Sequence, residues 1–412
     1  MRTSSRTPWL LAVLALLASL ALLAGCSSSA STARGQGITP TATSAHATPP
    51  SPTSPPPSAP PHALAWTQFD SSGTPQIWAS INGAVPAQIT HVASAGTECN
   101  NQIAWSPPVF SPDLRHIVAA LGGFNCGDGP LAGPVSIITV AGGAITNVPG
   151  ASTYVRVNQR TSGWLNDSTI YYITTAGLYT YTIGAGSPTA LPGVTKADEA
   201  VLRGNTLFWM RLDFAGSNWT ETLHRYDMSA HTALPGVIAM GQVHECQCSP
   251  GDFATVGWDA APDGAHVVYQ AVTPKTDADF GIASSRVYYA NADGSGASQI
   301  AQYMFTTSLV RMQISPNGAL VAITHALPSP SVITASVTSP GRAGDPNFHS
   351  YTPDALDFPA WKWDSTQFWA ATKPDSESSS PGTKALYNFR VGVASGSVSV
   401  SGGYNPWYTI GG

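Results

Sequence analysis

From residue 63 onward, the chain alternates between short apolar runs and the residues of tight turns. The clearest case is the stretch WDAAPDGAHVVYQAV, residues 258–272. Its turn, Pro262–Gly264, separates Val256–Trp258 from His266–Gln270. Proline presets φ, aspartate hydrogen-bonds its own backbone, and glycine accepts a positive φ. The flanking runs are rich in β-branched and aromatic residues, so the stretch predicts a β-hairpin that belongs to a larger sheet.

The same pattern returns about 40–55 residues apart, a spacing typical of propeller blades. The other copies are Pro108–Gly122, Ser162–Gly177, Ala200–Arg211, Val310–Ala326 and Phe358–Thr372. Most copies are accompanied by a second hairpin. These second hairpins are Gln76–Thr90, Val135–Gly150, Gly177–Gly193, Thr222–Gly236, Ser285–Ile300 and Ala385–Val400. Two hairpins make a four-stranded sheet, and radial repetition of such sheets is a β-propeller. We expect an all-β propeller of four-stranded blades, seven in number, with six as the alternative.

The two ends of the propeller region are expected to meet. Ala63–Thr90 has the pattern of a blade that lacks its innermost strand, and the C-terminal run Tyr404–Ile410, YNPWYTI, has the pattern of a strand. Adding the run to this blade would close the ring and remove a free sheet edge.

The turn sequences resemble the TolB-type, WD-like propeller repeat of exported bacterial proteins. The resemblance is carried by Phe110–Asp113, Pro262–Gly264, Ser315–Gly318 and Ala290–Gly294. It covers roughly residues 63–412, with gaps, and it implies the propeller fold but hardly constrains function. Two copies depart from it. Leu114 stands where the turn glycine is expected, and the turn within Trp164–Asp167 lacks proline and glycine.

Residues 1–25 have the pattern of an export signal, with Arg2 and Arg6 before an apolar run from Trp9 to Leu23. Cys26 follows Leu-Ala-Gly, as in the bacterial lipobox, where the cysteine thiol is lipidated. The alternative, a transmembrane anchor, needs about 20 apolar residues, and this run has about 15. Residues 26–62 are rich in Ser, Thr and Pro, so we expect a disordered stalk before a propeller domain at 63–412. The expected location is the extracytoplasmic face of the cell membrane.

The charge balance argues against a nucleic-acid partner. Only 10% of the residues are charged, with 18 basic and 23 acidic side chains. Removing Arg2 and Arg6 with the leader leaves 16 basic residues, so the net charge becomes −7. No basic patch is present that could neutralise phosphates.

Beyond Cys26, the chain has an even number of cysteines, which in an oxidising location predicts disulfides. The favoured pairs are Cys99–Cys126 and Cys246–Cys248, out of three possible pairings. The alternative is a metal site in HECQC, with His244, Cys246 and Cys248 as ligands and Glu245 beside them. Cys-x-Cys lacks the usual zinc spacing, so we expect no metal and no other cofactor.

The sequence contains no complete catalytic motif. A nucleophile elbow, a His-Glu-x-x-His zinc motif, a P-loop and a full calcium loop are all absent. Asp213, Glu221, His224 and Asp227 lie close together in sequence, and we interpret them as a solvated hairpin face.

The tryptophans divide into two groups. Five begin repeat hairpins, which suggests packing between blades. They are Trp105, Trp164, Trp258, Trp361 and Trp363. Trp209, Trp219 and Trp407 fall outside the repeat phase and could stack on a sugar or a partner.

The favoured function is a non-catalytic binding or scaffold module for a protein, peptide or glycan. The alternative is a propeller enzyme acting on extracellular carbohydrate as a lyase, hydrolase or sugar dehydrogenase. Carboxylates or histidines converging at the channel mouth would favour the enzyme, whereas hydroxyls, amides and aromatic rings would favour binding.

Overall fold

The computed structural model describes 58–93, 103–125, 129–130, 132–154, 160–174, 176–215, 218–244, 257–274, 282–303, 310–325, 331–338, 349–351, 359–371, 385–393, 398–401 and 403–411. Cys26, the leader and most of the stalk lie outside these residues, as do Cys99, Cys126, Glu245, Cys246 and Cys248. His244 ends a described strand, but its side chain lies outside the description. No helix in the described ranges is long and apolar enough to cross a membrane.

All regular structure in the described residues is β-structure. The first sheet joins β1 (His62–Phe69), β2 (Pro75–Ile81), β3 (Ala87–Gln88) and β30 (Gly403–Ile410). The second contains β4 (Ile103–Trp105), β5 (Val109–Phe110), β6 (His116–Asn125), β7 (Gly129–Pro130), β8 (Ala132–Thr139) and β9 (Ile145–Tyr154). The third contains β10 (Ser162–Trp164), β11 (Thr169–Thr174), β12 (Gly177–Thr182) and β13 (Thr189–Leu191).

An eight-stranded sheet follows. It contains β14 (Ala197–Arg203), β15 (Thr206–Ala215), β16 (Asn218–Asp227), β17 (Thr232–His244), β18 (Trp258–Ala260), β19 (His266–Pro274), β20 (Ile282–Asn291) and β21 (Ser298–Tyr303). The next sheet contains β22 (Val310–Ile314), β23 (Leu320–His325), β24 (Ser331–Ser336) and β25 (His349–Tyr351). The last contains β26 (Ala360–Trp361), β27 (Gln367–Ala371), β28 (Leu386–Arg390) and β29 (Val398–Ser401).

The eight-stranded sheet is two antiparallel four-stranded units held together by one parallel bridge, between Gly241 and Val272. Gly241 has a φ of +122°, and a Cβ at this position would lie 2.1 Å from the carbonyl oxygen of Val272. Only glycine therefore allows β17 and β19 to approach this closely.

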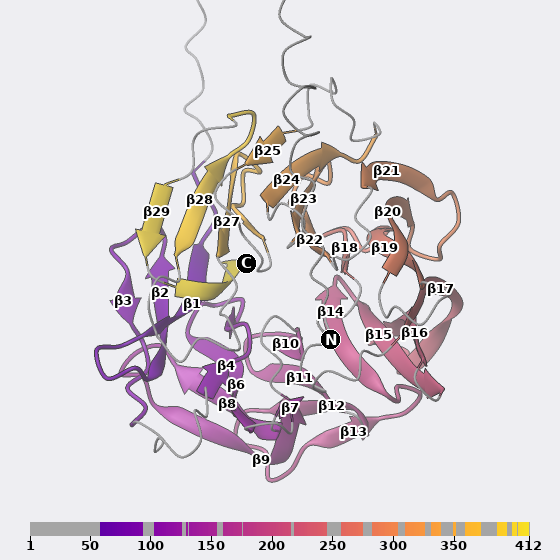
Figure 1. Cartoon of the computed structure of the whole chain (residues 1–412). Helices are drawn as coiled ribbons and strands as arrows, with labels where there is room; N and C mark the ends of the chain where they lie inside the picture. Colours follow the sequence, from indigo (N-terminus) through magenta and orange to yellow (C-terminus); the bar gives the residue numbers. More distant parts are fainter. Residues whose placement is uncertain are drawn as a thin grey trace, which may run out of the picture. The chain divides into compact units, whose positions relative to one another are not determined.

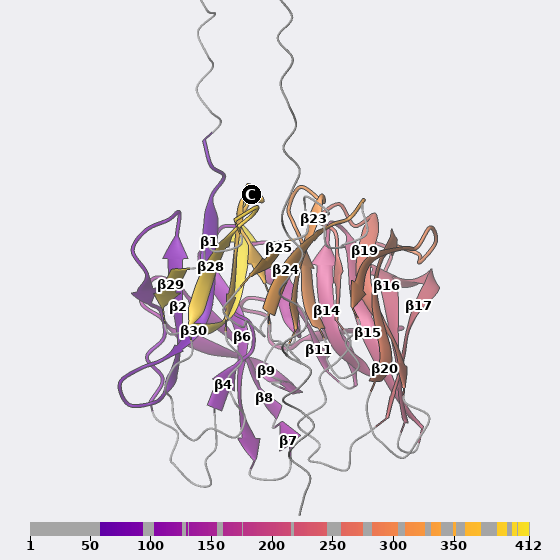
Figure 2. The same cartoon turned by 45° about the horizontal axis from the view of Figure 1, so that its top comes forward.

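The sheets of the folded unit are arranged around a common centre, with β10, β14, β18 and β22 near that centre (Figure 1). Seen after a tilt, the strands stand side by side around the ring (Figure 2). Antiparallel sheets in radial array are the β-propeller architecture. The prediction of an all-β propeller from the hairpin pattern is thereby confirmed.

The turns between the two innermost strands keep one shape with different residues. Pro262–Gly264 joins β18 to β19 as predicted, with Gly264 at a φ of +69°. Leu114 takes a φ of +59° at the corresponding place, an unfavourable conformation for leucine. Its side chain is buried in the same apolar cluster as Phe110 and Ile117, which offsets this cost. Between β10 and β11, the Asn166 Oδ1 accepts backbone N–H bonds from Ser168 and Thr169.

The C-terminal strand completes the first sheet. β30 pairs antiparallel with β1, from His62 opposite Ile410 to Gln68 opposite Gly403. This pairing, called the closing seam below, confirms the prediction that Tyr404–Ile410 supplies the missing strand. Tyr408 stacks on both His62 and Trp369, with ring centroids 5.7 and 5.5 Å apart.

Tryptophans fasten neighbouring sheets to each other, as the repeat pattern predicted. The indole N–H of Trp105 donates to the Pro75 carbonyl at 3.0 Å, and that of Trp164 donates to the Val109 carbonyl at 2.9 Å. Trp258 is fully buried, and Trp361 nearly so. Trp363 is half-buried.

Candidate functional site

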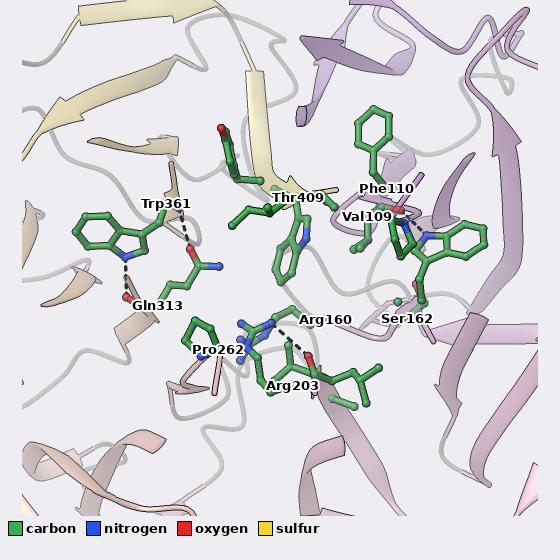
Figure 3. Close-up of a pocket in the computed structure, with 18 of the residues that line it drawn as sticks. Val109, Phe110, Arg160, Ser162, Arg203, Pro262, Gln313, Trp361 and Thr409 are labelled. Carbon is green, nitrogen blue, oxygen red and sulfur yellow. Dashed lines mark hydrogen bonds between the residues drawn. The ribbon is translucent and has the colours of Figure 1, made fainter. Parts of the chain in front are cut away.

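A cavity of about 390 Å³ lies at the centre of the ring, lined by the innermost strands. Most of the lining comes from β5, β10, β14, β22, β26 and β30. Pro262 in the turn after β18 and Tyr171 of β11 also contribute. Sheets distant in sequence therefore converge on one space. In Figure 3, Trp361 and Gln313 lie on one side, Val109, Phe110 and Ser162 on the other, and Arg160 and Arg203 below.

The cavity lies at the end of the ring where turns join the inner strands of several sheets. Pro112, Pro262 and Pro316, which belong to three of these turns, contribute to the lining. The folded unit also begins and ends here, because the backbone N–H of Gly411 donates to the Pro61 carbonyl at 2.7 Å.

Arg160, beside β10, is the centre of a buried ionic network. Its Nε donates to Glu199 on β14 at 2.6 Å, and its Nη1 donates to Asp259 on β18 at 2.6 Å. Its Nη2 donates to the Trp258 carbonyl at 2.7 Å, and the guanidinium lies 4.5 Å from the centre of the Trp258 ring. One side chain thus links the segment that leads into β10 to both four-stranded units of the eight-stranded sheet.

Asp259 extends the network to a second arginine. Its Oδ1 also accepts a bond from the Arg203 Nη2 at 3.2 Å, and its Oδ2 accepts the backbone N–H of Ile314 at 2.9 Å. The Arg203 Nε donates to the Ala260 carbonyl at 2.8 Å. The order of charges is therefore positive, negative, positive, negative, from Arg203 through Asp259 and Arg160 to Glu199.

Burial differs along this series of charges. Arg160, Glu199 and Asp259 are almost fully buried, whereas the Arg203 side chain keeps 19% of its surface exposed. Burial alone would lower the pKa of Arg160, but the charges and hydrogen bonds of Glu199 and Asp259 outweigh burial and raise this pKa above its usual value. Arg160 therefore stays charged. Both arginines belong to the cavity lining, and Arg203 is the more exposed of the two.

The rest of the lining is mainly aromatic and aliphatic, with a small number of polar groups. The Gln313 Oε1 accepts the backbone N–H of Trp361 at 3.0 Å, which fixes the amide beside the cavity. The Trp361 indole N–H donates to the Gln313 carbonyl at 2.9 Å, so the ring is held in place as well. Ser162, on the far side, is 4% exposed.

The structure does not assemble the four polar residues noted between 213 and 227. Asp213 forms ion pairs with Lys196 and Arg211, whereas Asp227 lies at the other end of the same hairpin. Glu221 is buried rather than solvated, so the interpretation of a solvated face is wrong for this residue. The ring of His224 stacks on that of Trp209, with centroids 4.4 Å apart. Burial lowers the pKa of His224, and the positive charge of Arg211 lowers it further.

Two of the tryptophans outside the repeat phase can be placed. Trp209 is 2% exposed, so it cannot stack on a sugar or a partner. Trp407 is 8% exposed and belongs to the cavity lining. The side chain of Trp219 is not among those that the structure describes. In the described part of the chain, no group of three or more His, Cys, Asp or Glu side chains is placed to hold a metal ion.

Sequence reasoning missed the ionic network. Its members lie between residues 160 and 259, and hydrophobic periodicity says nothing about side chains that meet across blades. One signal was present: Asp259 interrupts the buried run beside the Pro262–Gly264 turn, in a chain where charged residues are scarce. A charge inside a predicted inner strand needs a partner of opposite sign.

Comparison with known proteins leaves the family open. No protein-family model matches the chain, and no curated protein matches it. Among solved structures, the periplasmic gluconolactonase of Pseudomonas aeruginosa is 13% identical, with a TM-score of 0.48, and the match covers 85% of this chain and 99% of that protein. A Lactobacillus plantarum protein is 8% identical with a TM-score of 0.44, and the match covers 84% of this chain and 98% of that protein. A putative TolB of Agrobacterium tumefaciens is 12% identical with a TM-score of 0.38, covering 75% and 96%. Likenesses this distant carry no argument about function, and the fold assignment rests on the sheet topology.

Proposed function

We propose that this protein is a non-catalytic binding module whose ligand site is the central cavity. The observation that carries the proposal is the lining. Aromatic walls surround Arg203, the Gln313 amide and the Ser162 hydroxyl, and no Asp, Glu or His side chain is among the described residues that line the space. An apolar pocket with a small number of fixed polar groups is the usual form of a ligand site.

The lining favours binding over carbohydrate chemistry. Glycoside hydrolysis needs a pair of carboxylates on either side of the bond that is cleaved, and general acid–base steps need a titratable group within reach of the reacting atom. The acidic groups nearest to the cavity, Glu199 and Asp259, are buried and bonded to Arg160. Their hydrogen bonds serve the scaffold instead of a substrate.

We further propose that the ring has seven blades. The eight-stranded sheet divides at the Gly241–Val272 bridge into two units, and each unit joins four consecutive strands, as the sheets of β10–β13, β22–β25 and β26–β29 do. Counting these units separately gives one blade for each of the seven innermost strand positions around the cavity. The closing seam then joins the first blade to the last strand of the chain.

The location is proposed from the leader. Cys26 lipidation would tether the propeller to the outer face of the membrane through the stalk. In detergent phase separation, wild-type protein is expected in the detergent phase and Cys26→Ala protein in the aqueous phase or unprocessed. Ser27→Ala is the control that should behave like the wild type. Aqueous partitioning of mature wild-type protein would contradict the anchor.

The binding function is tested with a panel of small carboxylic acids, peptides and oligosaccharides added to the full mature protein in detergent. Thermal shift reports binding, and mass spectrometry of the panel reports any conversion. We expect ligands that raise the melting temperature without being converted. Ile410→Trp should abolish these shifts because Ile410 lines the cavity and is 45% exposed. Val393→Trp, equally exposed at 45% but outside the lining, is the matched control. Turnover that Ile410→Trp abolishes would contradict a non-catalytic role.

A further inference from the structure

We propose that the central cavity binds an apolar monocarboxylate, with the carboxylate on Arg203 and the apolar body between the aromatic walls. This inference rests on the proposed role of the cavity as a ligand site and adds the chemical class of the ligand. Three features carry it: the order of charges in the buried network, the donors that remain on Arg203, and the small number of polar groups in the lining.

The network has no net charge, but its two ends carry opposite charges. Arg203, its positive end, lies at the cavity, and Glu199, its negative end, lies in the protein interior. The Glu199 Oε2 has no hydrogen-bond partner among the described residues, so this end is not neutralised further. A ligand in the cavity lies closer to the charge of Arg203 than to the charges of its buried partners. Because the interaction energy of two charges falls with distance, this arrangement favours an anion beside Arg203.

Arg203 still has donors to offer. A guanidinium carries five N–H groups. Three of those on Arg203 have protein acceptors, which are the Ala260 carbonyl, Asp259 and, at 3.4 Å, the Leu202 carbonyl. One N–H on each Nη atom therefore remains among the described contacts, and a carboxylate accepts such a pair as a fork. Arg160 is less suited, because it is paired with two carboxylates, Glu199 and Asp259, and only 2% of its side chain is exposed.

The walls exclude a strongly hydroxylated ligand. A sugar leaves several hydroxyls to be paired, and each one buried without a partner costs binding energy. Apart from the arginines, the described lining offers a small number of polar side chains, among them Gln313, Ser162 and Thr409. Aromatic rings, such as those of Phe110 and Trp361, make up much of the rest. The volume is near the lower end of the range for ligand pockets. It suits a small molecule or the last residue of a chain.

N-acetyl-L-phenylalanine and N-acetyl-L-phenylalaninamide form a matched pair of probes, because they share a shape and differ in charge. Calorimetry on the full mature protein in detergent is expected to show the acid binding at least about 10-fold more tightly than the amide, as for a charge-assisted pair of hydrogen bonds. Arg203→Gln should remove this preference and leave the affinity for the amide within about twofold.

Because Arg203 also bonds to Asp259, each variant is checked by circular dichroism and melting temperature. Arg203→Lys keeps the charge without the fork, and it is expected to retain part of the preference for the acid. It keeps the proposal testable if Arg203→Gln fails to fold.

The carboxylate could belong to a free acid or to the C-terminus of a peptide. The peptide Gly-Gly-Gly-Gly-Phe and its C-terminal amide distinguish these sources. Tighter binding of the peptide acid than of N-acetyl-L-phenylalanine assigns a chain terminus, and the reverse assigns a free acid; both outcomes support carboxylate recognition.

Equal affinity for acid and amide would overturn the carboxylate assignment and leave the cavity as a binding site. Failure of both probes to bind would overturn the assignment too, whereas the wider panel tests the proposed function separately. Binding that persists in Ile410→Trp would place the ligand elsewhere and would overturn both proposals.

Discussion

Deletion of Gly403–Gly412 is expected to lower the melting temperature by at least about 10 °C, or to prevent folding. The deletion removes β30, which pairs with β1 along the closing seam. Its loss exposes the inner edge of β1. It also removes Trp407. This side chain packs in the same apolar cluster as Val201 and Trp258, which belong to the two units of the eight-stranded sheet.

The size of the effect follows from these losses. Burial of one large apolar side chain contributes about 1.5–3 kcal/mol, and each ladder hydrogen bond about 1 kcal/mol. For a domain of this size, 1 kcal/mol corresponds to roughly 2–4 °C or less. Ile410→Ser is the control on the same strand, since Ile410 is 45% exposed and its loss should shift the melting temperature by only about 1–2 °C. A truncated protein that melts like the wild type would contradict the importance of the closing seam.

The second large effect is expected for Arg160→Met. This substitution leaves Glu199 buried without its cation and leaves Asp259 with Arg203 alone, and it should cost about 3–5 kcal/mol of unfolding free energy. Chemical denaturation monitored by tryptophan fluorescence measures the cost. Arg115→Met is the matched control, because Arg115 pairs with Asp113 at 3.8 Å with 82% of its side chain exposed. The control should change the unfolding free energy by no more than about 0.5 kcal/mol.

A further variant separates the buried charge from the missing contact. Adding Glu199→Leu to Arg160→Met removes the carboxylate that lost its described cation, while Asp259 keeps Arg203. It should therefore recover part of the unfolding free energy instead of adding to the loss. If the double variant is less stable than Arg160→Met by the full cost of a core substitution, the network acts through packing and not through its charges.

Much of the fold could be predicted because it depends on local chemistry. A Pro-Asp-Gly turn between two β-branched runs encodes a hairpin within about 15 residues, and the recurrence of that hairpin encodes the ring. The pairing of β30 with β1 was also accessible, since the first blade lacked one strand and the last run had no partner. Leu114 shows the limit of motif matching: the turn shape persists without glycine because burial offsets the cost of the backbone conformation.

The candidate site could not be predicted in the same way. Arg160 lies beside β10, Glu199 and Arg203 lie on β14, and Asp259 lies on β18, so they meet only because the ring brings these inner strands together. Nothing in the residues next to Arg160 specifies two carboxylates 39 and 99 positions away. The sequence also misled at Glu221, since charge alone suggested a solvated surface whereas the side chain is buried.

The closing seam also orders events during synthesis. A ribosome delivers the chain from its N-terminus at about 5–20 residues per second, so β1 emerges long before the strand that pairs with it. Until β30 arrives, a nascent chain carries an unpaired β-edge that can hydrogen-bond to another molecule. Prematurely terminated products keep that edge permanently, and chaperones and proteases can thereby distinguish them from finished molecules.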